Sequence, residues 1–119
     1  MKRILLADDD DGIIDATRMM LELENYEVIP TLQGQRILEL AQKEQPDLIV
    51  MDIWMSGIDG RDICRMLKNT LQVQTIPVLM ISASRETRQS ALDAGATDFI
   101  EKPFDIDSLL EKVGSLLSK

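Results

Sequence analysis

The sequence predicts an α/β domain built on a five-stranded parallel sheet that is covered by helices on both faces. Two observations lead to this prediction. Short apolar runs alternate along the chain with segments of helical periodicity, which is the pattern of right-handed βαβ units. Three of the runs are almost continuously apolar, as strands buried on both faces should be. At 119 residues the chain has the length of one domain, so we expect a single domain over 1–119.

Five short apolar runs are the predicted strands. Each is too short for a helix and is bounded by Asp, Pro, Gly or Ser. In chain order they lie at residues 4–7, 28–29, 48–51, 78–81 and 99–100. The second run is weak and is followed by Pro30, which has no amide proton to donate. We therefore place this strand at an edge of the sheet.

Five amphipathic helices are predicted between and after these strands. The first ends near Asn25, the second ends before Pro46, and the fourth ends at Gly95, a residue type typical of helix C-caps. Asp105 precedes the fifth helix as its N-cap. In chain order the apolar positions are Ile13, Ala16, Met20, Leu21 and Leu23; Ile37, Leu40 and Ala41; Ile63, Met66 and Leu67, with Cys64 beside them; Ala91, Leu92 and Ala94; and Ile106, Leu109, Leu110, Val113, Leu116 and Leu117.

The composition excludes several classes of function. A net charge of −8 without a basic cluster opposes binding to nucleic acid, because the phosphates would be repelled. The chain contains no histidine, which removes histidine-based catalytic triads and histidine-ligated zinc. The single cysteine, Cys64, can form no internal disulfide. The apolar runs are too short to cross a membrane, so we expect a cytoplasmic protein.

Polar residues follow four of the five predicted strands at the point where each strand ends. Four aspartates at 8–11 follow the first strand, Asp52 follows the third, Ser82 the fourth and Lys102 the fifth. Ligands of open parallel sheets bind at the carboxyl ends of the strands. The fold should therefore bring these side chains together at one edge of the sheet.

This set of side chains predicts a phosphoryl-transfer site with a magnesium ion. Clustered carboxylates repel one another unless protons or a cation neutralise them, and all-oxygen ligands favour Mg²⁺. A carboxylate beside Mg²⁺ and a lysine is suited to accept a phosphoryl group, and a nearby hydroxyl can hydrogen-bond the product. Each residue alone is more commonly a turn former, a helix cap or a surface charge. Their joint placement favours the site.

Six segments then match one known family in order. They are ILLADDD (4–10), PDLIVMD (46–52), GIDG (57–60), PVLMISA (77–83), GATDF (95–99) and KPF (102–104). The sequence resembles the receiver domain of two-component response regulators over essentially its whole length. The resemblance implies a flavodoxin-like (βα)5 fold with strand order 2-1-3-4-5. Because the sequence ends two residues after Leu117, we expect no effector domain.

The resemblance also implies a function. Such a domain is a signalling switch rather than a conventional enzyme, although it assists its own phosphorylation and dephosphorylation. It accepts a phosphoryl group from the phosphohistidine of a sensor histidine kinase or histidine phosphotransfer protein. It then changes its affinity for a downstream protein partner. No nucleic acid or membrane is expected as a partner.

The family's functional residues carry over one by one. Asp52 matches the phosphorylated aspartate, Lys102 the lysine that binds phosphoryl oxygens, and Ser82 the switch hydroxyl. Phe99 matches the aromatic residue that moves inward when that hydroxyl engages the phosphoryl group. The implied Mg²⁺ ligands are Asp8, Asp9, Asp52 and the backbone carbonyl of Trp54. The lysine-proline peptide, here at Lys102, is often cis in the family.

Three positions depart from the family's usual pattern. Ser56 stands where proline is usual, Trp54 is bulkier than the usual residue, and Phe99 lacks the hydroxyl of the common tyrosine. None of these changes removes a chemical group needed for phosphorylation.

Two other functions are alternatives. The segment Asp9-Asp10-Asp11-Gly12 resembles the start of haloacid-dehalogenase-type phosphatases, which also use Mg²⁺, but Ile13 replaces the following threonine and no second acidic pair appears late in the chain. In such an enzyme Asp9 would carry the phosphoryl group. The second alternative is a receiver fold that is not phosphorylated and only scaffolds a partner.

Overall fold

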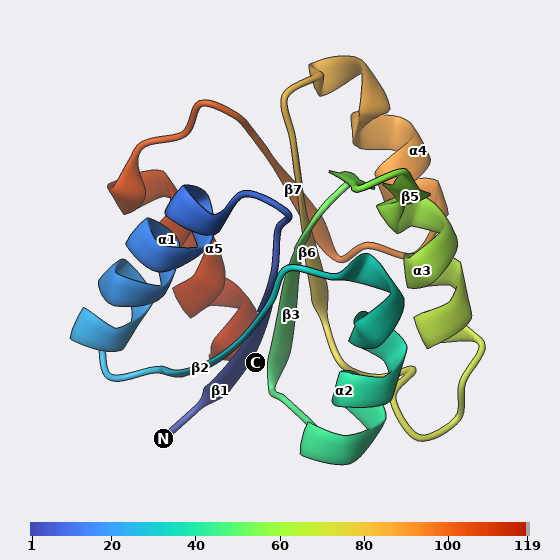
Figure 1. Cartoon of the computed structure of the whole chain (residues 1–119), viewed down its shortest axis with the longest axis horizontal. Coiled ribbons are helices and arrows are strands. Elements are labelled where there is room, and N and C mark those ends of the chain that lie inside the picture. Colours follow the sequence, from blue (N-terminus) through green and yellow to red (C-terminus); the bar gives the residue numbers. More distant parts are fainter. Residues whose placement is uncertain (119) are drawn as a thin grey trace.

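The predicted parallel sheet is present in the computed structural model, which describes residues 1–118 (Figure 1). The strands are β1 (Arg3–Ala7), β2 (Glu27–Thr31), β3 (Leu48–Asp52), β6 (Val78–Ser82) and β7 (Asp98–Glu101). All neighbouring pairs are parallel, and the order is β2-β1-β3-β6-β7. This confirms the five-stranded fold and the expected order, with the proline-containing strand β2 at an edge.

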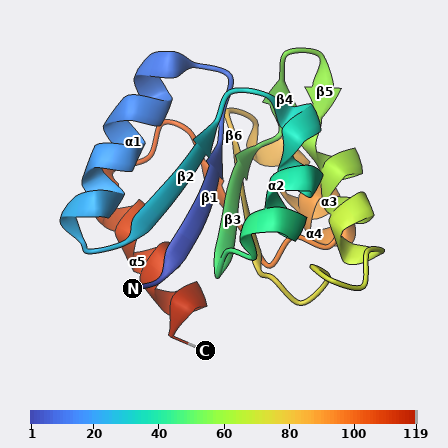
Figure 2. The same ribbon diagram turned by 60° about the horizontal axis from the view of Figure 1, so that its bottom comes forward.

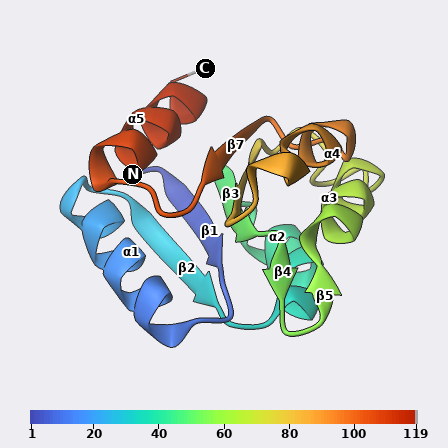
Figure 3. The same cartoon turned by 90° about the horizontal axis from the view of Figure 1, so that it is seen from above.

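Five helices cover the two faces of the sheet. They are α1 (Asp11–Leu23), α2 (Ile37–Glu44), α3 (Gly60–Lys68), α4 (Arg88–Asp93) and α5 (Ile106–Leu117). Short 3₁₀ turns, η1 (Gly34–Arg36) and η2 (Arg85–Thr87), precede α2 and α4. Helices α1 and α5 pack on one face and α2, α3 and α4 on the other, as the view from above shows (Figure 3).

The sheet separates two hydrophobic clusters, because successive strand residues point to opposite faces. On β1, Leu5 faces the cluster under α2, α3 and α4, whereas Ile4 and Leu6 face the cluster under α1 and α5. The same alternation continues on β3, where Ile49 and Val50 are both fully buried. This explains why the central strands read as continuous apolar runs.

Two predicted helix ends are confirmed in detail. The Asp105 carboxylate accepts a hydrogen bond from the amide of Ser108 at 2.7 Å and so caps α5. Gly95 has a φ of 110° just after α4, a conformation that favours glycine. Within residues 1–118, no helix combines the length and the apolar character that a membrane span requires.

Most of the predicted apolar stripe of α1 is wrong, although Leu21 is buried as expected. The buried positions are Ile14, Thr17 and Leu21, whereas Met20 is 39% exposed and Leu23 is 73% exposed. The helix is apolar around much of its surface, so periodicity alone did not identify the face that packs against the sheet.

A small antiparallel hairpin follows β3 and was not predicted. It consists of β4 (Trp54–Met55) and β5 (Ile58–Asp59), with Trp54 opposite Asp59. Ser56 and Gly57 form its turn with positive φ values of 49° and 82°. Two consecutive positive φ values are typical of two-residue hairpin turns. The hairpin stands above the carboxyl end of the sheet, beside the end of β3 (Figure 2).

Candidate functional site

The carboxyl ends of the strands bring the predicted polar residues together. Asp52 and Ser82 are the last residues of β3 and β6, while Asp8 directly follows β1 and Lys102 directly follows β7. Asp8, Asp52 and Ser82 lie on three neighbouring positions of the sheet because β3 pairs with both β1 and β6. The expectation of one shared edge is met for these residues.

Lys102 connects the two innermost carboxylates. Its Nζ atom lies 2.7 Å from Oδ2 of Asp52 and 3.1 Å from Oδ2 of Asp8. Only 5% of the Asp8 side chain, 13% of Asp52 and 21% of Lys102 is exposed. The ammonium group therefore offsets the repulsion between the two carboxylates.

Burial dominates the electrostatics of Asp52. Removal of the carboxyl from solvent raises its pKa above the ordinary value. The hydrogen bond from Lys102 lowers the pKa, and the negative charge of Asp8 raises it further, so that the net shift is upward. Burial acts to lower the pKa of Lys102, but the contacts with Asp52 and Asp8 prevail and the pKa is raised. The lysine therefore remains a cation at neutral pH.

Three of the four aspartates at 8–11 have different contacts. Asp8 is buried, accepts a bond from the amide of Asp10, and faces Lys102. Asp10 caps α1 by accepting from the amide of Ile13 at 3.1 Å. The exposed Asp9 carboxylate instead accepts from the amide of Ser56 at 2.8 Å, on the hairpin turn.

The donor set fits a magnesium ion that keeps several of its waters. Among residues 1–118, no three acidic, histidine or cysteine side chains converge into a preformed cage. Mg²⁺ needs only one or two carboxylates beside water and phosphate oxygens. Asp8 and Asp52 supply such a pair, and Asp9 lies beside it, held to the turn two residues beyond Trp54.

Comparison with known proteins decides the family. A sequence model described as "Response regulator receiver domain" matches residues 4–114. The chain belongs to this family.

Two curated relatives are identical to this receiver domain at about a third of the aligned positions. The DNA-binding dual master transcriptional regulator RpaA of Synechocystis is 36% identical over 121 residues, covering 100% of this chain and 50% of that protein. Response regulator MprA of Mycolicibacterium vanbaalenii is 35% identical over 119 residues, covering 98% and 51%. The chain thus spans about half the length of these curated relatives.

Solved structures share the fold of this receiver domain closely. A putative response regulator from Chloroflexus aurantiacus superposes with a TM-score of 0.94 at 28% identity, covering 99% of this chain and 98% of that one. Chemotaxis response regulator CheY4 of Vibrio cholerae gives 0.92 at 28% identity, covering 98% and 99%.

Gly60 lies against the backbone at the end of β3, a role the sequence did not assign. A Cβ atom at this position would lie 2.6 Å from the carbonyl oxygen of Asp52 and 3.1 Å from that of Ile53. Gly60 begins α3 directly after its N-cap, Asp59. The absence of a side chain therefore lets α3 start against the strand that carries Asp52.

Phe99, Pro103 and Trp54 are the remaining positions that the sequence singles out. Phe99 is buried on β7 with 5% exposed, and the Lys102–Pro103 peptide is cis. Trp54 is 57% exposed, and its ring centroid lies 5.4 Å from Cζ of Arg61. Arg61 was not singled out in the sequence, because an arginine early in a helix carries no signal of which residues it contacts.

Proposed function

We propose that this receiver domain is a phosphorylation-dependent signalling switch in which Asp52 accepts a phosphoryl group from a partner's phosphohistidine. The carrying observation is the placement of one half-buried lysine ammonium against Asp52 and Asp8 at the strand ends. The domain then changes its affinity for a partner protein.

In the transfer step, one carboxylate oxygen of Asp52 forms a bond to phosphorus as the bond between phosphorus and the partner's imidazole nitrogen breaks. The electron pair of the broken bond returns to the imidazole. Lys102 holds Asp52 in place, and its ammonium group can shift to hydrogen-bond the phosphoryl oxygens once they are attached to Asp52. Asp8, Asp9, Asp52 and the Trp54 carbonyl would hold a Mg²⁺ ion, which would supply further charge neutralisation.

The phosphohistidine donor must lie outside residues 1–119, because these residues contain no histidine. Its class is a sensor histidine kinase or a histidine phosphotransfer protein, and the expected setting is the cytoplasm. RpaA is named as DNA-binding, but the chain covers only half of that protein. The net charge of −8 opposes contact with DNA phosphates. We therefore assign no effector activity or nucleic-acid binding to residues 1–119.

The geometry favours this function over a haloacid-dehalogenase-like phosphatase. Asp9 would be the nucleophile of such an enzyme, yet its carboxylate is exposed and bonded to the amide of Ser56. The lysine instead reaches Asp52 and Asp8. The intact set of Asp52, Lys102 and Ser82 argues against a scaffold that is never phosphorylated.

Incubation with acetyl phosphate and Mg²⁺ tests the proposal. Intact-mass analysis should show the addition of one phosphoryl group, which EDTA prevents and which decays after the donor is removed. A chain that stays unmodified at saturating donor and Mg²⁺ would contradict the switch and favour the scaffold.

A further inference from the structure

The hydroxyl of Ser82 is engaged by its own loop. Ser82 is 2% exposed, its Oγ accepts from the amide of Ser84 at 3.0 Å, and it donates to the Ser84 carbonyl at 3.3 Å. The Thr87 hydroxyl also donates to Ser82 Oγ, at 3.0 Å. Among residues 1–118, no hydrogen bond joins Ser82 to Asp52. Ser82 must give up some of these bonds before it can donate to a phosphoryl group on Asp52.

Thr87 is the residue best placed to control that release. It ends the η2 turn directly before α4, and its hydroxyl donates both to Ser82 Oγ and to the Ser84 carbonyl, at 2.6 Å. A hydroxyl carries one proton, so the two acceptors share it. The Ser84 carbonyl also accepts from the amide of Thr87 at 3.1 Å. The turn can therefore persist without the Thr87 hydroxyl.

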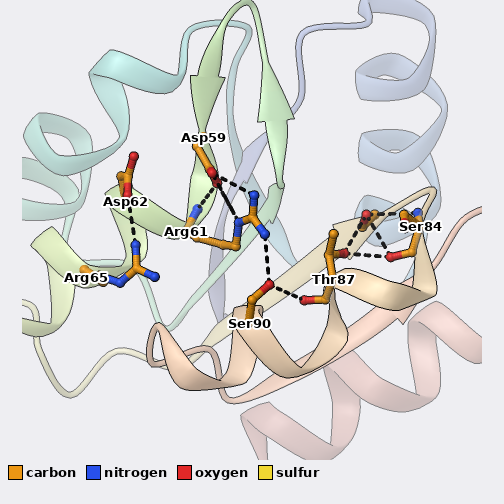
Figure 4. A network of polar contacts seen from close by, with 8 residues as sticks. Asp59, Arg61, Asp62, Arg65, Ser84, Thr87 and Ser90 are labelled. Atoms are coloured by element: carbon orange, nitrogen blue, oxygen red, sulfur yellow. Dashed lines mark hydrogen bonds and ion pairs between the residues drawn. The ribbon is translucent and has the colours of Figure 1, made fainter.

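A chain of polar contacts connects Thr87 to the hairpin beside Asp52 (Figure 4). The Ser90 hydroxyl donates to the Thr87 carbonyl at 3.0 Å and accepts from Nη1 of Arg61 at 2.9 Å. Arg61 is fixed in turn by a two-pronged contact with Asp59, at 2.9 Å from Nε to Oδ1 and 2.8 Å from Nη2 to Oδ2. Its guanidinium lies over the ring of Trp54.

We propose that Thr87 and Arg61 are positioning residues of a latch that holds the Ser82 hydroxyl on its loop until Asp52 is phosphorylated. Thr87 contacts Ser82 directly, whereas Arg61 acts through Ser90 by fastening α4 to the hairpin. The latch rests on the proposed function and extends it, because it sets the free-energy cost of engaging Ser82. Weakening the latch should favour the phosphorylated form.

Binding of beryllofluoride, a phosphoryl mimic, in the presence of Mg²⁺ measures this cost. Thr87→Val removes the hydroxyl but keeps the shape, and it should tighten binding about two- to tenfold, the value of one neutral hydrogen bond. Thr75→Val is the matched control, since Thr75 lies in the loop between α3 and β6 and lines a hollow with Lys2 and Asp47, away from the site. The control should bind as the unmodified protein does.

A double-mutant cycle separates the latch from a general packing effect. In a Ser82→Ala background there is no hydroxyl to release, so Thr87→Val should no longer change the affinity. A packing effect would change it equally in both backgrounds and would overturn the latch. Ser90→Ala should tighten binding in the unmodified protein but have no effect once Thr87→Val is present. An equal effect of Ser90→Ala in both backgrounds would overturn the role of Arg61.

The cycle also distinguishes the two proposals. If the unmodified protein binds beryllofluoride with Mg²⁺ but Thr87→Val has the same affinity, the latch is wrong and the proposed function stands. If the unmodified protein does not bind beryllofluoride at all, the proposed function fails and the latch fails with it.

Discussion

Nζ of Lys102 lies 2.7 Å from Oδ2 of Asp52, although the two residues are 50 positions apart in the sequence. The same nitrogen reaches Asp8 at 3.1 Å. The ammonium group thus offsets the repulsion between the two carboxylates.

Lys102→Met should destabilise the fold, because it leaves Asp8 and Asp52 facing each other without a counter-charge. We expect the free energy of unfolding in urea to fall by about 2 kcal/mol without metal, the value of losing hydrogen bonds to charged groups. Adding Asp52→Asn should recover much of this loss by removing one of the two charges. A double variant as unstable as Lys102→Met alone would show that charge is not the cause.

Asp52→Asn alone should raise the melting temperature of the metal-free protein. The folded protein disfavours the charged carboxylate, since burial raises the pKa of Asp52. Because the pKa of Asp52 is higher in the folded state than in the unfolded state, the free energy of unfolding falls as the pH rises from the ordinary pKa through the raised one. The advantage of Asp52→Asn should therefore be largest near neutral pH and shrink towards the ordinary aspartate pKa of about 3.9.

Magnesium binding also tests whether the charged Asp52 carboxylate destabilises the folded protein. Mg²⁺ should raise the melting temperature of the unmodified protein by binding the folded state, and should do so much less for Asp52→Asn. If Asp52→Asn melts at a lower temperature than the unmodified protein without metal, the charged Asp52 carboxylate does not destabilise the fold.

Gly60→Ala should cost about 1–3 kcal/mol of stability, because the new Cβ would press on the Asp52 carbonyl oxygen 2.6 Å away. It should also slow phosphorylation by acetyl phosphate, since relief of the contact displaces Asp52. Gly114→Ala is the control, because Gly114 lies within α5 and a Cβ atom there would meet no neighbouring atom within 4 Å. This substitution should raise the free energy of unfolding by about 0.5–1 kcal/mol. Equal urea midpoints for the two variants would show that the close approach is unimportant.

Trp54→Ala should shorten the lifetime of phosphorylated Asp52. An indole at the rim of the site would hinder the water that must attack in line, and its removal would admit that water. Affinity for Mg²⁺ should stay similar, because the expected ligand is the backbone carbonyl. The fluorescence of this single tryptophan should also change on Mg²⁺ titration. An unchanged or longer lifetime would leave the ring only its packing against Arg61.

The sequence was sufficient for the sheet and for the residues at its carboxyl edge. The strand runs end where Asp8, Asp52, Ser82 and Lys102 stand, and topology alone brings such ends together. The sequence indicates repulsion between clustered carboxylates and places Lys102 at the same edge. It does not indicate how deeply Asp52 is covered, and burial is the largest cause of its raised pKa. It also does not indicate that Nζ of Lys102 contacts both carboxylates.

Other features depend on packing that a one-dimensional pattern does not contain. The buried face of α1 was largely misassigned, because Met20 and Leu23 are apolar yet partly or mostly exposed. The β4–β5 hairpin has strands of two residues, too short for alternation to be visible. Arg61 and Ser90 connect α3 to α4 although they are 29 positions apart in the sequence, and no local pattern indicates this contact.

Mapping the phosphoryl group after reaction with acetyl phosphate and Mg²⁺ tests the central claim most directly. Borohydride reduction of the acyl phosphate followed by peptide mass spectrometry locates the modified aspartate. We predict modification at Asp52 alone and none in Asp52→Asn. Modification of Asp9 or Asp8, or full labelling of Asp52→Asn, would contradict the account.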